Sequence, residues 1–317
     1  MNTISYLEAS TLALRQEMER DPLVWALGED LGRGGVFGQY GDLQRRFGPA
    51  RICDTPISES TIMGAAVGAA MMGTRPVVEM RFSDFALCAV DELVNQAAKA
   101  RFMFGGQAKV PLVARLPIGM WRSSAAQHSQ SLESWWTHIP GLVVVAPSTP
   151  ADNHALLRAA IRCDDPVVYH EHKDLWGLKG EVDERAEPAR LGEARILRPG
   201  NDVTVVTWSK TVHVALEAAA LAGSPSLEVI DLRTLWPWDR ATVFGSAQRT
   251  GRLLVAHEAV RVGGFGGEIA AEAAEQLGVK VRRLGAPRIP IAYAKPMEDQ
   301  ARITAAAIAA AARLLLG

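Results

Sequence analysis

Residues 141–172, GLVVVAPSTPADNHALLRAAIRCDDPVVYHEH, decide the fold class because they read as strand, helix and strand in succession. The apolar run at 141–148 predicts a strand bounded by turn residues. Thr149 and Pro150 are typical of the N-cap and first position of a helix, which we expect over 149–163. The run at 166–172 predicts a second strand. Strands that alternate with helices in this way indicate a mostly parallel sheet.

The same alternation continues on both sides of this stretch. Before it, we expect strands at 23–28, 75–82 and 110–117, and a helix over 90–106 that is closed by glycines. After it, we expect strands at 202–208, 226–233 and 252–259, with helices at 211–223, from Glu268 onward and at the C-terminus. The sequence therefore predicts an α/β protein of two domains, each a mostly parallel sheet flanked by helices.

A polar, charged segment at 179–200 separates the two alternating regions, and it predicts a linker and an edge strand. We place the first domain at 1–185, the linker at 186–200 and the second domain at 201–317. A length of 317 residues also favours two domains over one.

Composition excludes several classes of protein. With 48% hydrophobic and 22% charged residues and a net charge of -1, the chain gives no whole-protein basis for binding nucleic acid or an anionic membrane. The longest uncharged apolar run, 60–74, is shorter than a membrane span needs, which is about 18 residues. Three scattered cysteines suggest neither a disulfide framework nor a metal pair, so we expect a cytoplasmic protein.

Glu59 lies in DTPISES, residues 54–60, directly before the apolar stretch TIMGAAVGAAMMG. A carboxylate is favourable at the N-terminus of a helix, which gives a structural interpretation. A carboxylate against an apolar wall can instead share a proton with a ligand nitrogen. The spacing alone does not decide between the two.

Other residues carry weaker signals. His128 lies in a loop of small polar residues, where it could transfer protons or simply bond the backbone. Phe82 and Phe85 follow a strand, which is where α/β sheets bind ligands, although core aromatics are more common. His170 and His172 share a strand face but lack a third ligand at a supporting spacing, so zinc is not favoured.

Several segments together resemble one family: DTPISES, RFSDF (81–85), VDELVNQAAKARFMFGG (90–106), AAQHSQS (125–131), DLRTLWPWD (231–239) and GGFGGEIAA (263–271). They are similar to the β subunit of the thiamine-diphosphate-dependent E1 component of 2-oxo acid dehydrogenase complexes, closest to the pyruvate and acetoin types. The resemblance spans nearly the whole chain. It implies a transketolase-like pyrimidine-binding domain followed by a transketolase C-terminal-like domain.

The resemblance also implies roles for individual residues. Glu59 falls on the glutamate that bonds the aminopyrimidine ring of thiamine diphosphate and helps to deprotonate the thiazolium C2. Phe85 falls on the aromatic residue that stacks on that ring, and Ile57 is a further cofactor-binding position. His128 falls on a histidine near the reacting centre and the path of the acyl acceptor. A structural potassium ion is implied near Leu112, Ala160, Ile161, Cys163 and Asp165, with Cys163 standing where an aspartate is usual.

The chain has no GDG-type stretch that would bind Mg²⁺ and the diphosphate. The resemblance therefore implies that a separate α subunit supplies Mg²⁺ and the diphosphate half of the site, in an α2β2 heterotetramer.

Three functions remain open at this stage. The first is decarboxylation of a 2-oxo acid, or cleavage of acetoin, with acyl transfer to the lipoyl domain of an E2 acyltransferase. The second is a carboligase that makes acyloins without a lipoyl acceptor, suggested by Trp121 and Arg122 where the family has small residues. The third is a non-catalytic β-like chain, in which Glu59 is only a carboxylate at the N-terminus of a helix.

Overall fold

The computed structural model describes residues 1–221 and 223–317, which form two compact units. The first unit comprises residues 1–118 and 135–191, and the second comprises residues 119–134 and 192–317. Each unit has a mostly parallel sheet with helices packed against it, so the predicted fold class is confirmed.

The sheet of the first unit runs in the order β6 (Val143–Val145), β7 (Val167–His172), β5 (Val113–Ile118), β4 (Arg75–Glu79), β2 (Val24–Gly28) and β3 (Ile52–Asp54). All neighbouring pairs in this order are parallel. The carboxyl ends of these strands therefore meet at one edge, where α/β sheets usually bind ligands.

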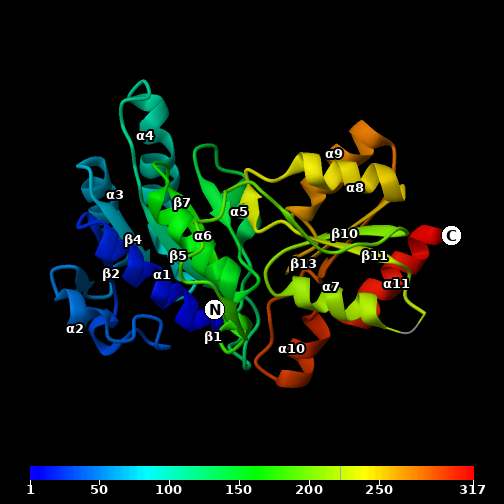
Figure 1. Ribbon diagram of the computed structural model, residues 1–317, viewed down its shortest axis with the longest axis horizontal. Helices are drawn as coiled ribbons and strands as arrows, with labels where there is room; N and C mark the ends of the chain where they lie inside the picture. Colours follow the sequence, from blue (N-terminus) through cyan, green and yellow to red (C-terminus); the bar gives the residue numbers. More distant parts are fainter. Residues whose placement is uncertain (222) are drawn as a thin grey trace. The chain divides into compact units, whose positions relative to one another are not determined.

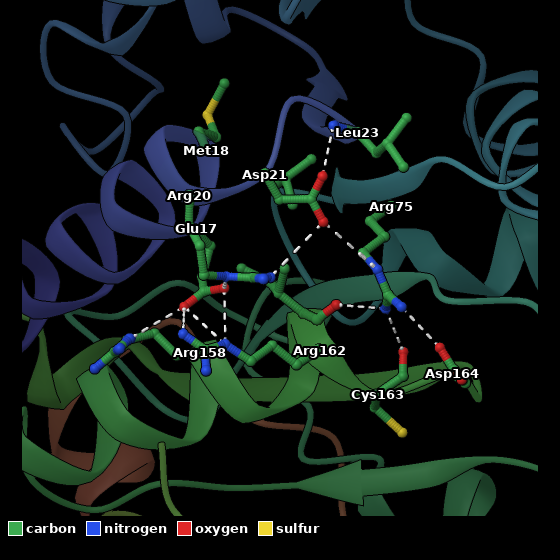
Figure 2. Close-up of polar contacts among 12 residues, drawn as sticks. Glu17, Met18, Arg20, Asp21, Leu23, Arg75, Arg158, Arg162, Cys163 and Asp164 are labelled. Carbon is green, nitrogen blue, oxygen red and sulfur yellow. Dashed lines mark hydrogen bonds and ion pairs between the residues drawn. The ribbon is translucent and has the colours of Figure 1, made fainter. Parts of the chain in front are cut away.

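Helices α1 (Tyr6–Arg20) and α6 (Pro150–Arg162) lie side by side on one face of this sheet (Figure 1). The predicted start of α6 is confirmed, because the Thr149 side chain accepts a hydrogen bond from the Asp152 amide at 3.1 Å and Pro150 is the first helical residue. Buried Glu17 of α1 also pairs with Arg158 and Arg162 of α6 at 3.1 and 2.8 Å (Figure 2). Apolar packing and this ion cluster together hold the two helices.

The remaining elements of the first unit are short, apart from α3 (Glu59–Met71), which packs against β4. The predicted helix over 90–106 is more irregular than its sequence suggests: it contains a π-helical segment, η3 (Glu92–Ala97), followed by α4 (Ala98–Met103). Gly105 and Gly106 end it with φ values of 62° and 83°, which favour glycine. The other short elements are β1 (Asn2–Ser5), η1 (Leu31–Arg33), α2 (Leu43–Phe47), η2 (Phe85–Ala89), η4 (Lys173–Leu175) and β8 (Lys179–Val182). The short helix α5 (Glu133–Thr137) begins in the last residues of the 119–134 segment and continues into the first unit.

The sheet of the second unit runs in the order β14 (Lys280–Ala286), β13 (Arg252–Val260), β10 (Val203–Thr207), β11 (Leu227–Asp231) and β9 (Arg195–Arg198). Its strands are parallel except for β9, which is the edge strand predicted within 179–200. Helices α7 (Thr211–Ala220) and α11 (Ala305–Leu316) cover one face, and α8 (Arg240–Thr250) and α9 (Gly266–Leu277) cover the other (Figure 1). β12 (Thr234–Trp236) and α10 (Lys295–Ala301) complete this unit.

The glycine-rich turn at 263–267 is explained by a buried histidine. A Cβ on Gly264 would lie 2.6 Å from Cε1 of His257, and one on Gly266 would lie 2.8 Å from its Cδ2. The His257 ring also stacks on Trp208 with a centroid distance of 5.1 Å. These glycines therefore let α9 begin against an aromatic pair, which accounts for the turn without a phosphate-binding role.

Within residues 1–221 and 223–317, no helix is both long enough and apolar enough to cross a membrane.

Candidate active site

Three consecutive strand ends place the predicted residues of the first unit at the carboxyl edge of its sheet. Glu29 follows β2, the DTPISES segment leads from β3 into α3, and Arg81 to Phe85 follow β4. Gly28 keeps these strand ends close, because a Cβ at this position would lie 2.8 Å from the carbonyl oxygen of Glu79. The sheet therefore gathers Glu59 and Phe85 at the edge where parallel sheets bind ligands.

Glu59 is the first residue of α3, and its side chain is partly exposed. Ser58 stands at the N-cap, but its hydroxyl bonds Thr61 Oγ1 at 2.8 Å and makes no capping bond to the backbone. The N–H groups of the first turn consequently receive no side-chain cap from Ser58, and the positive end of the helix dipole lies beside the carboxylate. Ile57, two residues earlier, is 75% exposed, so an apolar side chain accompanies Glu59 at the surface.

A second acid lies close to Glu59. Burial raises the pKa of Glu29, the positive charge of Arg81 opposes this shift, and the negative charge of Glu59 adds to it. Arg81 adopts a φ of 55° and pairs with Glu29 at 3.3 Å and also with Asp30. The edge thus holds, besides Glu59, a carboxyl group at Glu29 whose protonated form is favoured by burial.

An aromatic cluster adjoins these acids. The ring of Phe85 meets that of Phe82 edge to face at 5.4 Å between centroids, and Phe82 meets Phe37 at 5.8 Å. Phe37 in turn contacts Trp176 at 4.6 Å, and the ammonium of Lys173 lies 4.8 Å from the centre of the Phe82 ring. Phe85 is partly exposed and begins η2, so its ring is fixed by neighbours yet accessible.

His128 belongs to the second unit, because the segment 119–134 packs there after leaving β5. The residue is partly exposed, and its backbone amide points to the carbonyl oxygen of Ala125 at 3.5 Å. The neighbouring residues Ser129–Leu132 line a cavity of about 420 Å³ together with Glu258, Arg288 and apolar residues of the same unit. The first unit therefore brings Glu59, Ile57 and Phe85 together, whereas His128 is positioned by the second.

Comparison with known proteins identifies the family. The chain matches the transketolase pyrimidine-binding domain over residues 2–178 and the transketolase C-terminal domain over residues 192–308. It is 46% identical to the acetoin:2,6-dichlorophenolindophenol oxidoreductase subunit beta of Cupriavidus necator, covering 95% of this chain and 94% of that protein. This chain belongs to the family of E1-type β subunits.

Other β subunits of the family support the same assignment. The chain is 41% identical to the 2-oxoisovalerate dehydrogenase subunit beta of Bacillus subtilis, with 99% of each chain covered. It is also 41% identical to the pyruvate dehydrogenase E1 component subunit beta of Rickettsia bellii, with 94% of each covered. This family uses thiamine diphosphate, and its β subunits work with an α subunit.

The fold of this β subunit is shared with a solved structure, a split-gene transketolase described as an inactive β4 tetramer. The TM-score is 0.82, with 99% of this chain and 98% of that chain covered, at 23% sequence identity. At this identity the likeness concerns the fold alone.

The five residues implied for potassium lie around the C-terminal end of α6 in this β subunit. Ala160 and Ile161 are in its last turn, Cys163 caps it, Asp165 follows, and Leu112 precedes β5. The guanidinium of Arg75 donates to the carbonyl oxygens of Ile161 and Cys163 at 3.0 and 3.1 Å and pairs with Asp164 at 2.7 Å (Figure 2).

The acceptors that a cation here would need are shared with arginine side chains. A carbonyl oxygen has two lone pairs, so its bond to Arg75 leaves one available, and the C-terminal end of a helix favours positive charge. The carboxylate of Asp165 also pairs with Arg101. Among the described residues, no group of three His, Cys, Asp or Glu side chains could hold a metal ion, so a cation here would depend on carbonyl oxygens.

Sequence reasoning missed Glu29, Arg81 and Lys173. Glu29 and Arg81 each follow a parallel strand of one sheet, at the edge where Glu59 and Phe85 also lie. That shared position is a signal which the sequence carries, because charged residues directly after buried strands meet at one edge. Lys173 has no such signal, since its burial beneath Phe82 depends on the packing of η4.

Proposed function

We propose that this chain is the β subunit of an enzyme that decarboxylates a 2-oxo acid, or cleaves acetoin, and passes the acyl group to a lipoyl domain. The observation that carries the proposal is Glu59, a partly exposed carboxylate at the start of α3, on the sheet edge that also holds Phe85. The named activities of relatives that are 41–46% identical over nearly the whole chain support it.

The residues at this edge fit the aminopyrimidine ring of thiamine diphosphate. The carboxyl group of Glu59 can donate a hydrogen bond to a ring nitrogen, and can accept one once that nitrogen is protonated. The accessible ring of Phe85 offers a stacking surface, and exposed Ile57 offers an apolar wall. When bound, the cofactor supplies the carbanion chemistry. The proposed role of Glu59 is to exchange a proton with the aminopyrimidine ring at its carboxyl group.

His128 is proposed as the second catalytic residue, acting on the acyl group and its acceptor. It lies in a loop of small polar residues beside the cavity of the second unit, and a histidine in such a position can exchange a proton near neutral pH. The cytoplasm is the proposed location.

We further propose an α subunit as partner, in an α2β2 heterotetramer, with Mg²⁺ and the diphosphate held mainly by the α chain. Large apolar side chains that are exposed on this chain support a covered surface: Phe102 is 89% exposed, Met103 71% and Met72 85%. An E2 lipoyl acyltransferase is the proposed acceptor, and potassium is proposed at the end of α6. The matches over 2–178 and 192–308 support two domains, proposed at 1–185 and 201–317 with a linker at 186–200, although the second match begins at residue 192, within that linker.

The test is an acyl-transfer assay on the purified αβ assembly with pyruvate, 2-oxoisovalerate and acetoin. We expect one of these to acylate a lipoyl domain, and Glu59→Gln to lower kcat on the order of 10²-fold, because the amide cannot take up the proton. Glu275→Gln, which changes an exposed glutamate of α9, is the matched control and should behave as wild type.

Two results would redirect the proposal. Acyloin formation without acylation of the lipoyl domain would support the carboligase. One observation favours that alternative: the guanidinium of Arg122 lies 4.8 Å from the centre of the Trp121 ring, so this loop carries two large side chains. Full activity of the Glu59→Gln assembly would reduce Glu59 to a helix-end carboxylate and favour a non-catalytic chain.

A further inference from the structure

The loop 119–134, which carries His128, is fastened within the second unit by side chains distant in sequence. At its start, the amide of Met120 donates to Glu258 Oε1 at 2.7 Å. At its end, the indole of Trp208 donates to Glu133 Oε1 at 3.1 Å. Between these anchors, the loop reaches α10, where Glu298 lies.

Glu298 holds the middle of the loop with both of its carboxylate oxygens. Oε2 accepts a hydrogen bond from the backbone amide of Ser123 at 2.8 Å, and Oε1 accepts one from Arg302 Nη2 at 2.7 Å. The same Arg302 nitrogen donates to the carbonyl oxygen of Met120 at 2.9 Å. Glu298 is only 2% exposed, so these charge-assisted bonds are shielded from water and are correspondingly strong.

The backbone that Glu298 holds is strained. Arg122, Ser123 and Ala125 have φ values of 48°, 55° and 61°, although none is a glycine. Side chains make this region unfavourable, and such residues keep this conformation only where the surrounding structure holds them. A loop with this backbone would relax if its anchors were lost, and His128 lies three residues after Ala125.

We propose that Glu298 is a positioning residue: by binding the Ser123 amide and Arg302, it holds the strained loop in the one conformation that presents His128 for catalysis. The proposal rests on the proposed function, because it gives His128 a role. It adds a residue of α10, more than 160 positions further along the chain, to the machinery of the reaction.

The sharpest variant is Glu298→Gln. Its amide has one acceptor oxygen where the carboxylate offers two, so a donor of Ser123 or Arg302 must face the –NH₂ group. Hydrogen exchange of residues 120–126 should become at least tenfold faster in the αβ assembly. We expect kcat to fall by about 10- to 100-fold, as for a misplaced catalytic group, with the dissociation constant of thiamine diphosphate unchanged. Glu298→Asp, which keeps both acceptor oxygens, should recover part of the loss, and Glu275→Gln should change nothing.

Wild-type exchange rates in Glu298→Gln would overturn the proposal, and so would faster exchange with an unchanged kcat. If that variant fails to assemble, Arg302→Gln keeps Glu298 and removes its partner, and the same pattern is expected. His128→Ala separates this proposal from the proposed function. An unaffected kcat in His128→Ala would refute the catalytic role of His128, while hydrogen exchange in Glu298→Gln would still show whether Glu298 holds the loop.

Discussion

At the scale of single residues, Glu79 is a buried acid whose positive neighbour does not offset its burial. It ends β4, is 3% exposed, and lies 3.5 Å from Nη1 of Arg115. That arginine is already engaged by Glu171, to which it donates from Nε and Nη2 at 2.8 and 2.6 Å. Burial therefore raises the pKa of Glu79 from 4.5 to about 7, despite the opposing charge of Arg115.

This shift predicts a pH dependence of stability. Between pH 4.5 and about pH 7, folded Glu79 keeps a proton that the unfolded chain has lost, so the folded state binds more protons and becomes less stable as pH rises. Glu79→Gln removes this pH-dependent contribution to the free energy of unfolding, which is on the order of 1–3 kcal/mol. When the pH rises from about 5.5 to about 8, the Tm of the variant should therefore fall less than the Tm of the wild-type protein. An identical loss in both proteins would show that Glu79 is already ionised at the lower pH.

Residue patterns alone predict part of the edge of the first sheet. The strand-like runs predict where Glu59 and Phe85 lie, whereas their roles could be predicted only from the family resemblance. The role of Glu29 could not, because it depends on Arg81 and Glu59, which come from other strand ends. Whether Glu59 also acts in catalysis stays a prediction that the αβ assay must test.

At the scale of elements, the C-terminal end of α6 carries a prediction about potassium. The carbonyl oxygens of Ala160, Ile161 and Cys163 lie at the negative end of the helix dipole, where a bound cation would stabilise the folded state. We expect the Tm of the αβ assembly to be a few degrees higher in potassium chloride than in sodium or choline chloride at equal ionic strength.

Asp165→Asn should weaken this potassium effect if the carboxylate takes part. Equal Tm values in all three salts would mean that Arg75, which already donates to two of these carbonyls, suffices at this helix end.

Elements with strong local signals were predictable. The N-cap of α6 follows from Thr149 and Pro150, and both are confirmed. The π-helical segment Glu92–Ala97 was not predictable, because an apolar pattern with period near 3.6 does not show where one extra residue enters a turn. The positive φ angles within residues 119–134 were also not predictable from the sequence, since this backbone is held by contacts with α10.

At the scale of the whole molecule, the proposed division of the active site between the α and β chains predicts how the cofactor binds. We expect the isolated β chain to bind thiamine diphosphate weakly, because the aminopyrimidine contacts of Glu59 and Phe85 would be the only ones it offers. Adding the α subunit and Mg²⁺ should increase the affinity at least tenfold. Titration calorimetry of the β chain with and without its α partner measures this, and tight binding by β alone would rule out the divided site.

The two alternating regions of the chain were predictable from periodicity, because each repeats strands and helices. The assignment of residues 119–134 was not predictable, since this segment directly follows β5 in the sequence but packs with residues 192–317. No local pattern of small polar residues reveals contacts to Glu258 or Glu298, which are more than 130 positions away.

The packing of residues 119–134 with the second unit has a consequence for dividing the protein into fragments. A fragment ending at Leu191 would contain the loop but none of its anchors, so Met120, Ser123 and Glu133 would lose the partners that Glu258, Glu298 and Trp208 provide. A fragment starting at Gly192 would keep those anchors with nothing to hold. The two halves are therefore poor candidates for separate expression, for exchange between relatives, or for evolutionary fission at residue 191, even though the match to the second family domain begins at residue 192.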